Sequence, residues 1–522
     1  MDSTGASSAA ARRGNDRDRF SLRRFLEELV AAGECEQRDA PIELADIAQA
    51  LESEKAVWFR AAGPERAELV GNVAGSRARL ARAFGVAPKD LLAEVMRRLN
   101  TKPELVEVPR AEAPVQQVVV TGEAIDLTTL PVHLQHGLDG GPYISGSIDY
   151  VKDKATGLTN VGIRRLMLRG KAETGVDLVS PSDLRAIYEA HAARGENLPV
   201  AFTVGSHPID FVAATMRLPV DELGLVASLR DAPLPVVKCV SNDIRVPADA
   251  EWVLEGYFDA KGYVESEGPY GEFLGYYGGV KQNPVFRCTA ITRRHDAIFQ
   301  TTTIGGYHMS RTDSAPLVAL RTEATVWQAL QSAVREPLNV YATTATGGMF
   351  NVRISLRQRV PGEARNAILA AFASLANVKN VFVVDPDIDI FSDEQIDWAL
   401  ATRFQPDRDI IIESGLRALP LDPSLSGGSR IGAKAGFDLT WPFGTGGALE
   451  RTVPKPPAYA GKRFTDLRAA LKEGPKYFEE LMTGLASRDG REIVRALDRL
   501  RQEGDLKRDE RGRWALRGAP SP

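Results

Sequence analysis

Cysteine is scarce in this sequence, and its scarcity limits the chemistry that the chain can use. Only three cysteines occur among 522 residues, Cys35, Cys239 and Cys288, and they form no C-x-x-C pair. A disulfide scaffold and a thiolate zinc site are therefore not expected. Reduced thiols of this kind are typical of a cytoplasmic protein, which is our prediction for its location.

Long apolar runs and targeting signals are missing as well. No uncharged apolar stretch reaches the roughly 18 to 20 residues that a membrane-spanning helix needs. The first residues are rich in Ser, Ala, Arg and Asp and lack the apolar core of a signal peptide. We expect residues 1–18 to form a disordered tail, and we expect no membrane partner.

The charge balance and the motif content exclude further classes. The chain has 65 Lys and Arg against 69 Asp and Glu, a net charge of −4, so no global field favours nucleic acid. There is no G-x-x-x-x-G-K-[ST] phosphate loop and no nucleophile elbow. The six histidines show no zinc spacing beyond His133-x-x-His136.

Four segments follow the tail, and their patterns predict an α+β protein. Residues 19–110 are a helical or mixed region, and 111–325 consist of short strands separated by glycine and proline. Residues 326–463 alternate helix and strand like a small α/β domain. We expect helices over 20–30, 42–53, 88–99, 181–193, 210–216, 325–336 and 363–375, and strands over 117–120, 144–151, 201–204, 235–240, 297–301, 350–356 and 380–384.

The last segment, 464–522, has a different pattern. An amphipathic helix over 491–502 is followed by a charged hairpin with Gly512 at its tip. This pattern is typical of a winged-helix unit, which suggests either DNA binding or a role in packing and oligomerisation. Because acidic residues are mixed with the basic ones, the segment lacks a strong DNA footprint, and we do not expect nucleic acid as a partner.

The densest cluster of unusual residues runs from Glu265 to Gly279. Two glycines and a proline lie between Glu267 and Glu272, so this stretch is predicted to turn and bring the two carboxylates together. The nearby aromatic residues would desolvate these carboxylates and raise their pKa values, which suits proton transfer near neutral pH. A solvated surface turn is the alternative interpretation.

Two further charged groups lie within apolar sequence. Arg164 and Arg165 interrupt an apolar run, and a buried arginine needs an anionic partner. The acids around Glu267 are candidates for that partner, in a structural ion pair or in an active site. Glu255 lies in the apolar segment Trp252–Gly256, where an acid on a helix surface is the simpler interpretation.

Together these clusters resemble the UbiD family of reversible decarboxylases, which use prenylated flavin mononucleotide (FMN). The match covers about residues 110–450 in the order of the family. Its pieces are Thr159-Asn160-x-x-x-x-Arg165, Pro235–Cys239, Asn242-Asp243 with Val246–Ala248, Glu255-Gly256, Glu267–Glu272, Trp398-Ala399 with Thr402-Arg403, and Lys434-x-Gly436-x-Asp438. The resemblance implies a split β-barrel that binds the flavin and a smaller α/β oligomerisation domain.

The resemblance also implies roles for individual residues. Arg165, Glu267 and Glu272 match the catalytic trio, with Glu272 as the proton donor. Asn160 and Glu255 match the ligands of a divalent metal, Mn²⁺ or Mg²⁺, that holds the cofactor phosphate, and K⁺ is expected beside it. Lys434 matches a lysine that reaches the phosphate. The implied cofactor-binding set is Asn160, Gly162, Ile163, Arg164, Arg165, Ser182, Glu255 and Lys434.

One position departs from the family pattern. Where several members place a metal-binding histidine in a Pro-x-His step, this chain has Pro181-Ser182-Asp183. Asp183 can still bind a hard cation, although its charge would change the metal preference.

The resulting hypothesis is a cytoplasmic decarboxylase of an aromatic or heteroaromatic carboxylic acid, free or as a thioester. A homodimer or homohexamer is expected, supplied with cofactor by a prenyltransferase. An α,β-unsaturated or polyprenyl-type acid is the alternative substrate. A flavin-binding regulator that binds DNA through the C-terminal segment, and an assembly subunit without cofactor, are the alternatives of other classes.

Overall fold

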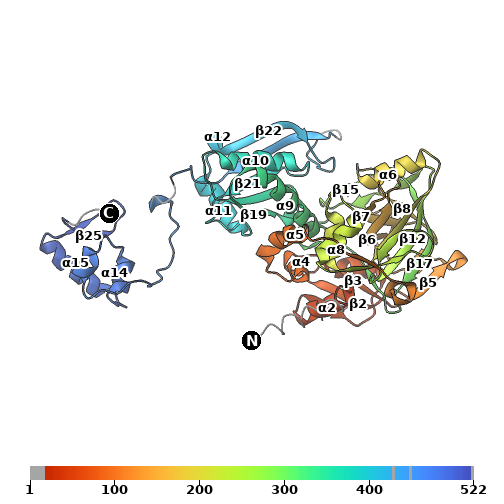
Figure 1. Cartoon of the computed structure of the whole chain (residues 1–522), viewed down its shortest axis with the longest axis horizontal. Coiled ribbons are helices and arrows are strands. Elements are labelled where there is room, and N and C mark those ends of the chain that lie inside the picture. Colours follow the sequence, from red (N-terminus) through yellow and green to blue (C-terminus); the bar gives the residue numbers. More distant parts are fainter. Residues whose placement is uncertain (1–17, 426–428, 446–448, 519–522) are drawn as a thin grey trace. The chain divides into compact units, whose positions relative to one another are not determined.

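The computed structural model describes residues 18–425, 429–445 and 449–518 (Figure 1). Residues 1–17 of the predicted tail lie outside the described residues. The chain divides into two units, residues 1–440 and 441–522, each of which is considered by itself. Within the described ranges, no helix is long and apolar enough to cross a membrane.

The first part of unit 1, where a helical or mixed region was predicted over 19–110, is a mixed sheet with helices. Its strands lie in the order β1-β2-β3-β18. Strand β2 contains the buried run Ala56-Val57-Trp58-Phe59, and β-branched and aromatic residues favour strand. The elements are α2 (Leu22–Ala31), β1 (Cys35–Arg38), α3 (Ile47–Ala50), β2 (Ala56–Ala62), β3 (Ala67–Gly71), α4 (Arg77–Phe84), α5 (Leu91–Arg98) and β18 (Ile298–Gln300).

The centre of unit 1 is a closed antiparallel barrel of six strands. The order is β12-β9-β6-β7-β8-β17, and β17 pairs again with β12 to close the ring. Inside it, Phe202 packs edge-on against Phe258 and Phe286 with ring centroids 6.0 and 5.0 Å apart. The strands are β6 (Tyr143–Lys152), β7 (Thr159–Leu168), β8 (Glu173–Val176), β9 (Leu198–Val204), β12 (Trp252–Phe258) and β17 (Val285–Arg293), with β5 (Val118–Thr121) added to β17. The predicted barrel is confirmed.

Helices and short strands surround the barrel and carry much of the pocket described below. Predicted helices at 181–193 and 210–216 are confirmed as α6 and α7. The additional elements are β4 (Leu105–Glu107), α6 (Asp183–Ala192), α7 (Pro208–Thr215), α8 (Glu222–Arg230), β10 (Leu234–Lys238), β11 (Arg245–Pro247), β13 (Glu265–Glu267), β14 (Tyr270–Gly271), β15 (Tyr277–Gly278) and β16 (Lys281–Asn283).

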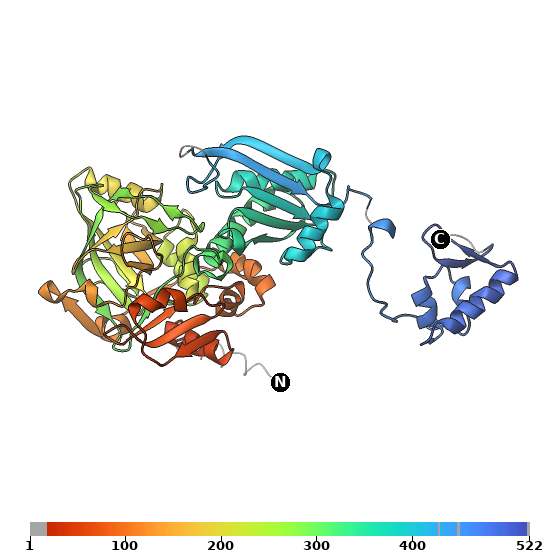
Figure 2. The same ribbon diagram turned by 180° about the vertical axis from the view of Figure 1, so that it is seen from behind.

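The rest of unit 1 is the predicted small α/β domain. Its five-stranded sheet has the order β19-β20-β21-β23-β22. The long helix α9 runs from Ser314 to Ala333, so the predicted border at 325 falls inside a continuous helix. Figure 2 shows α9 leading from the barrel into the sheet. The elements are α9 (Ser314–Ala333), β19 (Pro337–Ala342), β20 (Asn351–Leu356), α10 (Glu363–Ser374), β21 (Asn380–Val384), α11 (Asp393–Arg403), α12 (Pro406–Asp409), β22 (Ile410–Arg417) and β23 (Ile431–Asp438).

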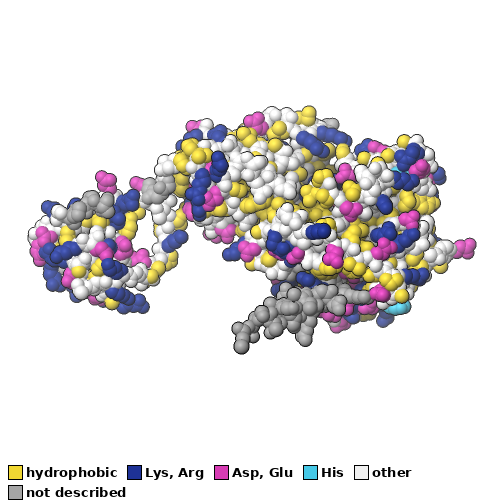
Figure 3. Space-filling model, in the orientation of Figure 1, with side chains coloured by type: hydrophobic (Ala, Val, Ile, Leu, Met, Phe, Trp, Pro, Cys, Tyr) yellow, Lys and Arg dark blue, Asp and Glu magenta, His cyan; other side chains and the backbone are white. Residues whose placement is uncertain are grey.

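Unit 2 has the predicted winged-helix pattern. Lys476 pairs with Trp514 of its hairpin in an isolated antiparallel bridge. Figure 3 shows Lys and Arg interspersed with Asp and Glu on the face of unit 2 in view. The elements are α13 (Leu467–Lys472), α14 (Phe478–Gly484), α15 (Arg491–Gln502), β24 (Leu506–Arg508) and β25 (Trp514–Leu516).

Candidate active site

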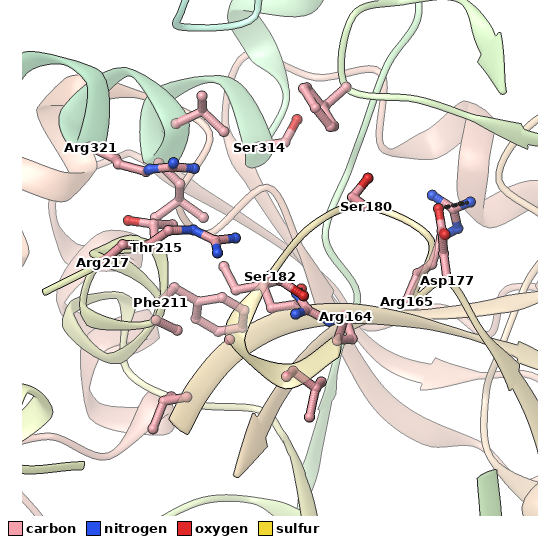
Figure 4. Close-up of a pocket in the computed structure, with 18 of the residues that line it drawn as sticks. Arg164, Arg165, Asp177, Ser180, Ser182, Phe211, Thr215, Arg217, Ser314 and Arg321 are labelled. Atoms are coloured by element: carbon pink, nitrogen blue, oxygen red, sulfur yellow. Dashed lines mark hydrogen bonds and ion pairs between the residues drawn. The ribbon is translucent and has the colours of Figure 1, made fainter. Parts of the chain in front are cut away.

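The main pocket of unit 1 has a volume of about 310 Å³ and lies beside strand β7. Its walls come from β7, the segment between β8 and α6, the end of α7, the start of α8, the turn after β14, and α9 (Figure 4). The sequence-predicted residues that line it are Asn160, Gly162, Ile163, Arg164, Arg165, Ser182, Asp183 and Glu272.

The position of Arg165 depends on a bulge in the neighbouring strand. The register between β6 and β7 shifts so that Ser145 and Gly146 together face Arg165. A bulge of this kind bends the strand and redirects the side chains opposite it. Glycine is required at position 146 because a Cβ there would lie 2.5 Å from the carbonyl oxygen of Gln300.

Arg165 holds three carboxylates at one end of the pocket. Its Nε and Nη2 donate to Glu267 at 2.9 and 3.2 Å, and its Nη1 donates to Glu272 at 3.0 Å. Asp177 lies 3.0 Å from Nη2. The ring of Tyr270 stacks on the guanidinium, with 4.4 Å between the guanidinium carbon and the ring centroid. The structure therefore brings the predicted trio together and adds Asp177.

The environment of Glu272 suits a proton donor. Burial raises the pKa of its carboxyl, while Arg165 and Lys281 lower it and Asp177 raises it further; the net shift is upward. The Nζ of Lys281 lies 3.8 Å from Glu272 Oε1 and 3.1 Å from Asp177 Oδ2. A carboxyl with a raised pKa keeps its proton closer to neutral pH, which general acid catalysis needs.

The other end of the pocket contains oxygen ligands for a cation. Glu222 Oε2 accepts hydrogen bonds from Asn160 Nδ2 at 2.7 Å and from the Val161 amide at 2.6 Å. These bonds leave Asn160 Oδ1 and Glu222 Oε1 for another partner. Burial, together with the nearby Asp183 and Asp149, raises the pKa of Glu222 to about 7, so a bound cation would relieve the repulsion among these carboxylates.

This set is incomplete as a metal site by itself. Within the described parts of the chain, no three His, Cys, Asp or Glu side chains converge on a common point suited to a metal. A divalent ion would therefore need the Asn160 amide oxygen and an oxygen of the bound ligand to complete its shell. Such an all-oxygen shell suits Mg²⁺ or Mn²⁺.

Three arginines lie near these oxygen ligands. Figure 4 shows the guanidinium groups of Arg217 and Arg321 pointing into the same part of the pocket. Neither makes an ion pair with any other described side chain. Burial and the neighbouring Arg217 together lower the pKa of Arg321 to about 10. Arg164 lies 3.7 Å from the buried Asp149. Arg217 and Arg321 are therefore the guanidinium groups that suit a phosphate.

Glu255, which was predicted as a metal ligand, does not line the pocket. This residue lies on β12 outside the pocket, and it is fully buried. Its carboxylate accepts hydrogen bonds from the amides of Val240 and Ser241 at 3.0 and 2.7 Å, and from the Ser241 hydroxyl. Glu255 therefore anchors a loop, and Glu222 is the carboxylate that lies beside Asn160.

Lys434 is likewise not in the pocket. It lies on β23, and its Nζ donates to the carbonyl oxygens of Phe372 and Leu375, both at 2.7 Å. Those carbonyls are at the C-terminal end of α10, where a cation is favourable. Lys434, predicted to reach the cofactor phosphate, thus makes structural contacts in this fold, whereas Arg217 and Arg321 line the pocket.

The residues that sequence reasoning missed are Asp177, Glu222, Arg217, Lys281 and Arg321. Glu222 follows Asp221 at the start of α8, where acids are common helix-capping residues, so its sequence context carries no special signal. Arg217 and Arg321 adjoin apolar residues, and the argument applied to Arg165 could have identified them.

Comparison with known proteins gives a consistent result. Three family models match: the 3-octaprenyl-4-hydroxybenzoate carboxy-lyase N-terminal domain over residues 36–99, the Rift-related domain over 106–308 and the C-terminal domain over 316–439. A curated relative, anhydromevalonate phosphate decarboxylase from Methanosarcina mazei, is 33% identical over 375 residues, which is 72% of this chain and 85% of that protein.

Solved structures show the same relationship. The UbiD-class enzyme HmfF from Pelotomaculum thermopropionicum, in complex with FMN, has a TM-score of 0.77 and 32% identity, covering 83% of this chain and 97% of that chain. An evolved dimeric form of HmfF, in complex with prenylated FMN, has a TM-score of 0.75 and 30% identity, covering 84% and 97%. The apo 3,4-dihydroxybenzoic acid decarboxylase from Enterobacter cloacae has a TM-score of 0.77 and 28% identity, covering 84% and 96%.

These proteins match the chain along most of its length, including the closed antiparallel barrel and the α/β domain joined to it. This architecture defines a class of carboxy-lyases. The chain belongs to the UbiD family. The predicted family is thus confirmed, and the matched models end before unit 2.

Lys281 provides a test of the electrostatics around Glu272. Replacing Lys281 by Met removes a cation 3.8 Å from the carboxyl and should raise the pKa of Glu272 further. Infrared titration would follow the carboxyl band that disappears in Glu272→Gln. Its midpoint should move to higher pH in Lys281→Met and stay near the wild-type value in Lys281→Arg. A midpoint that moves to lower pH in Lys281→Met would contradict this assignment.

Proposed function

We propose that this chain is a reversible decarboxylase that uses prenylated FMN and acts on an aromatic or heteroaromatic carboxylic acid, free or as a thioester. The observation that carries the proposal is the division of one pocket into two charged ends. Arg165 and its carboxylates form one end, and Asn160, Glu222 and the arginines form the other. Solved relatives with FMN and prenylated FMN support this choice of cofactor.

The phosphate end suits a divalent metal together with a phosphate group. The positive charges of Arg164, Arg217 and Arg321 there are balanced in number by the carboxylates of Asp149, Asp183 and Glu222. A divalent cation and a phosphate dianion can enter together without leaving net charge in a buried site. Asn160, Glu222 and Asp183 would hold Mn²⁺ or Mg²⁺, Arg217 and Arg321 would hold the phosphate, and we expect K⁺ nearby.

At the catalytic end, the protein supplies orientation, charge and a proton. Prenylated FMN, when bound, supplies an electron sink for the carbon that loses carbon dioxide. Arg165 holds Glu272 toward the pocket, and Glu267 offsets the charge of Arg165. After carbon dioxide leaves, Glu272 donates its proton to that carbon, and in the reverse direction it removes the proton.

The remaining wall of the pocket suits an apolar substrate. Phe273, Ile304, Leu317, Val318 and Leu421 line it. A planar aromatic acid fits such a wall, whereas the curated decarboxylase of anhydromevalonate phosphate supports the alternative of an α,β-unsaturated aliphatic acid. A screen for solvent deuterium incorporation into candidate aromatic and aliphatic products distinguishes the two.

The assembly and the supply of cofactor are part of the proposal. We expect a homodimer or homohexamer, since an evolved form of one relative is described as dimeric. We also expect a prenyltransferase to supply the prenylated cofactor. All three cysteines are free and buried, which suits the reducing cytoplasm.

Glu272 tests the proposed reaction. In protein loaded with prenylated FMN and Mn²⁺, Glu272→Gln should lower the decarboxylation rate by about 10²- to 10⁴-fold, because it removes the general acid. Glu265→Gln is the matched control, since Glu265 is an exposed acid on the same hairpin and should leave the rate unchanged. Undiminished decarboxylation in Glu272→Gln would exclude the assigned role.

Glu222 and Glu255 test the corrected metal site. Glu222→Gln should weaken Mn²⁺ binding in the presence of FMN by at least about tenfold, measured by electron paramagnetic resonance. Glu255→Gln should bind Mn²⁺ as the wild type does. It should lower the melting temperature, because the side-chain NH₂ group of Gln would face the backbone N–H of Val240 or Ser241, donor against donor. Loss of metal in Glu255→Gln alone would restore the original assignment.

A further inference from the structure

A loop before the barrel, residues 133–141, lies against the turn that carries Glu272. Asp139 Oδ1 accepts a hydrogen bond from the Gly271 amide at 2.8 Å, and the Gly140 amide donates to the Pro269 carbonyl at 2.8 Å. The Leu138 amide also donates to the hydroxyl of Tyr277, whose strand pairs with Gly271. Because Gly271 directly precedes Glu272, this loop fixes the backbone that positions the proton donor.

His136 connects this loop to a second segment beside Glu272. Its Nδ1 lies 3.2 Å from Asp139 Oδ2, which also accepts the His136 amide at 3.0 Å, and its Nε2 lies 2.7 Å from the Ile304 carbonyl oxygen. A carboxylate and a carbonyl are both acceptors only. Both ring nitrogens must therefore donate, and only the imidazolium does so. A neutral ring would turn a lone pair toward one of the two oxygens.

The ring of His136 is packed tightly against the catalytic turn. A side chain at Gly271 would overlap the imidazole, and the rings of Tyr270 and Tyr277 meet it edge-on with centroids 6.0 and 6.3 Å away. On the other side, Gly305 approaches the Glu272 backbone so closely that a Cβ there would lie 2.7 Å from the Glu272 carbonyl oxygen. His136 thus contacts both the catalytic turn and the segment at Ile304 and Gly305, which itself lies against Glu272.

We propose that His136, as an imidazolium bonded to both Asp139 and the Ile304 carbonyl, is a positioning residue that holds Glu272 in place for proton transfer. His136 does not line the main pocket and acts only through the backbone of the catalytic turn. The consequence for reaction rate rests on the function proposed above, whereas the consequence for the structure of the turn does not.

The surroundings of His136 set the direction of its pH dependence. Burial lowers its pKa, but Asp139 and the Ile304 carbonyl outweigh burial, so the net pKa is raised. The bonds are therefore complete below the ordinary histidine pKa and are lost as the pH rises through the raised value. The pKa of His133 is lowered to about 4, so that ring stays neutral in this range. His136 also lines a second, smaller pocket outside the main one. The other titratable groups that face His136 or line this second pocket are Glu52, Asp139, Tyr270, Tyr277, Tyr307, His308 and Arg311.

Hydrogen–deuterium exchange of the full chain tests the structural part without any assay of activity. In the wild type, the peptide covering residues 268–277 should exchange faster once the pH passes the pKa of His136, after correction for intrinsic exchange. His136→Gln retains a donor toward Ile304 and His136→Asn retains one toward Asp139. Both should exchange about tenfold faster at neutral pH and show no such pH step. The control His308→Asn changes an exposed histidine of the same pocket and should exchange as the wild type does.

The result that overturns the proposal is the absence of the pH step in the wild type, or its persistence in both His136 variants. Peptides from β9 and β12 should exchange at wild-type rates in all variants, which shows that the barrel is folded. In loaded enzyme, His136→Gln should lower kcat by about 10- to 100-fold with little change in KM. If no variant, including the wild type, decarboxylates any acid, the proposed function fails while the exchange result still stands.

Discussion

The structure of the active site depends on the buried guanidinium of Arg165. An unpaired buried charge costs several kcal/mol, so Arg165 can lie at the pocket only with its carboxylates present. Its three partners, Asp177, Glu267 and Glu272, come from separate segments, and the bulge in β6 directs the arginine toward them. One cation therefore fixes the end of β8 and both sides of the catalytic turn to strand β7.

This arrangement separates binding from chemistry along one pocket. The barrel supplies Asn160 and Arg165 from the same strand, so the proposed phosphate site and the proposed acid are held by one rigid element. The loop at 133–141 then supports the catalytic turn from outside the pocket. Unit 2 lies beyond the matched family models, and on its face in view in Figure 3 basic and acidic side chains are mixed.

Much of the site could be predicted because its residues occur in short contiguous motifs. The resemblance to the family identified Arg165, Glu267 and Glu272, and the structure brings them together from one strand and one turn. Glu255 and Glu222 show where such reasoning fails. Each is an acid next to apolar sequence. Backbone amides donate hydrogen bonds to Glu255, whereas the side chain of Asn160 donates to Glu222. Only tertiary contacts distinguish them, and the same is true of Lys434, whose partners are the end of α10.

A crystal structure of the chain with prenylated FMN and Mn²⁺, with data at the manganese absorption edge, tests the central claim most directly. The division of the pocket predicts an anomalous peak bonded to Asn160 and Glu222, the phosphate between that peak and Arg217, and the flavin ring at Arg165 and Glu272. Manganese at Glu255, or a flavin with its ring at the arginine cluster and its phosphate at Arg165, would contradict it.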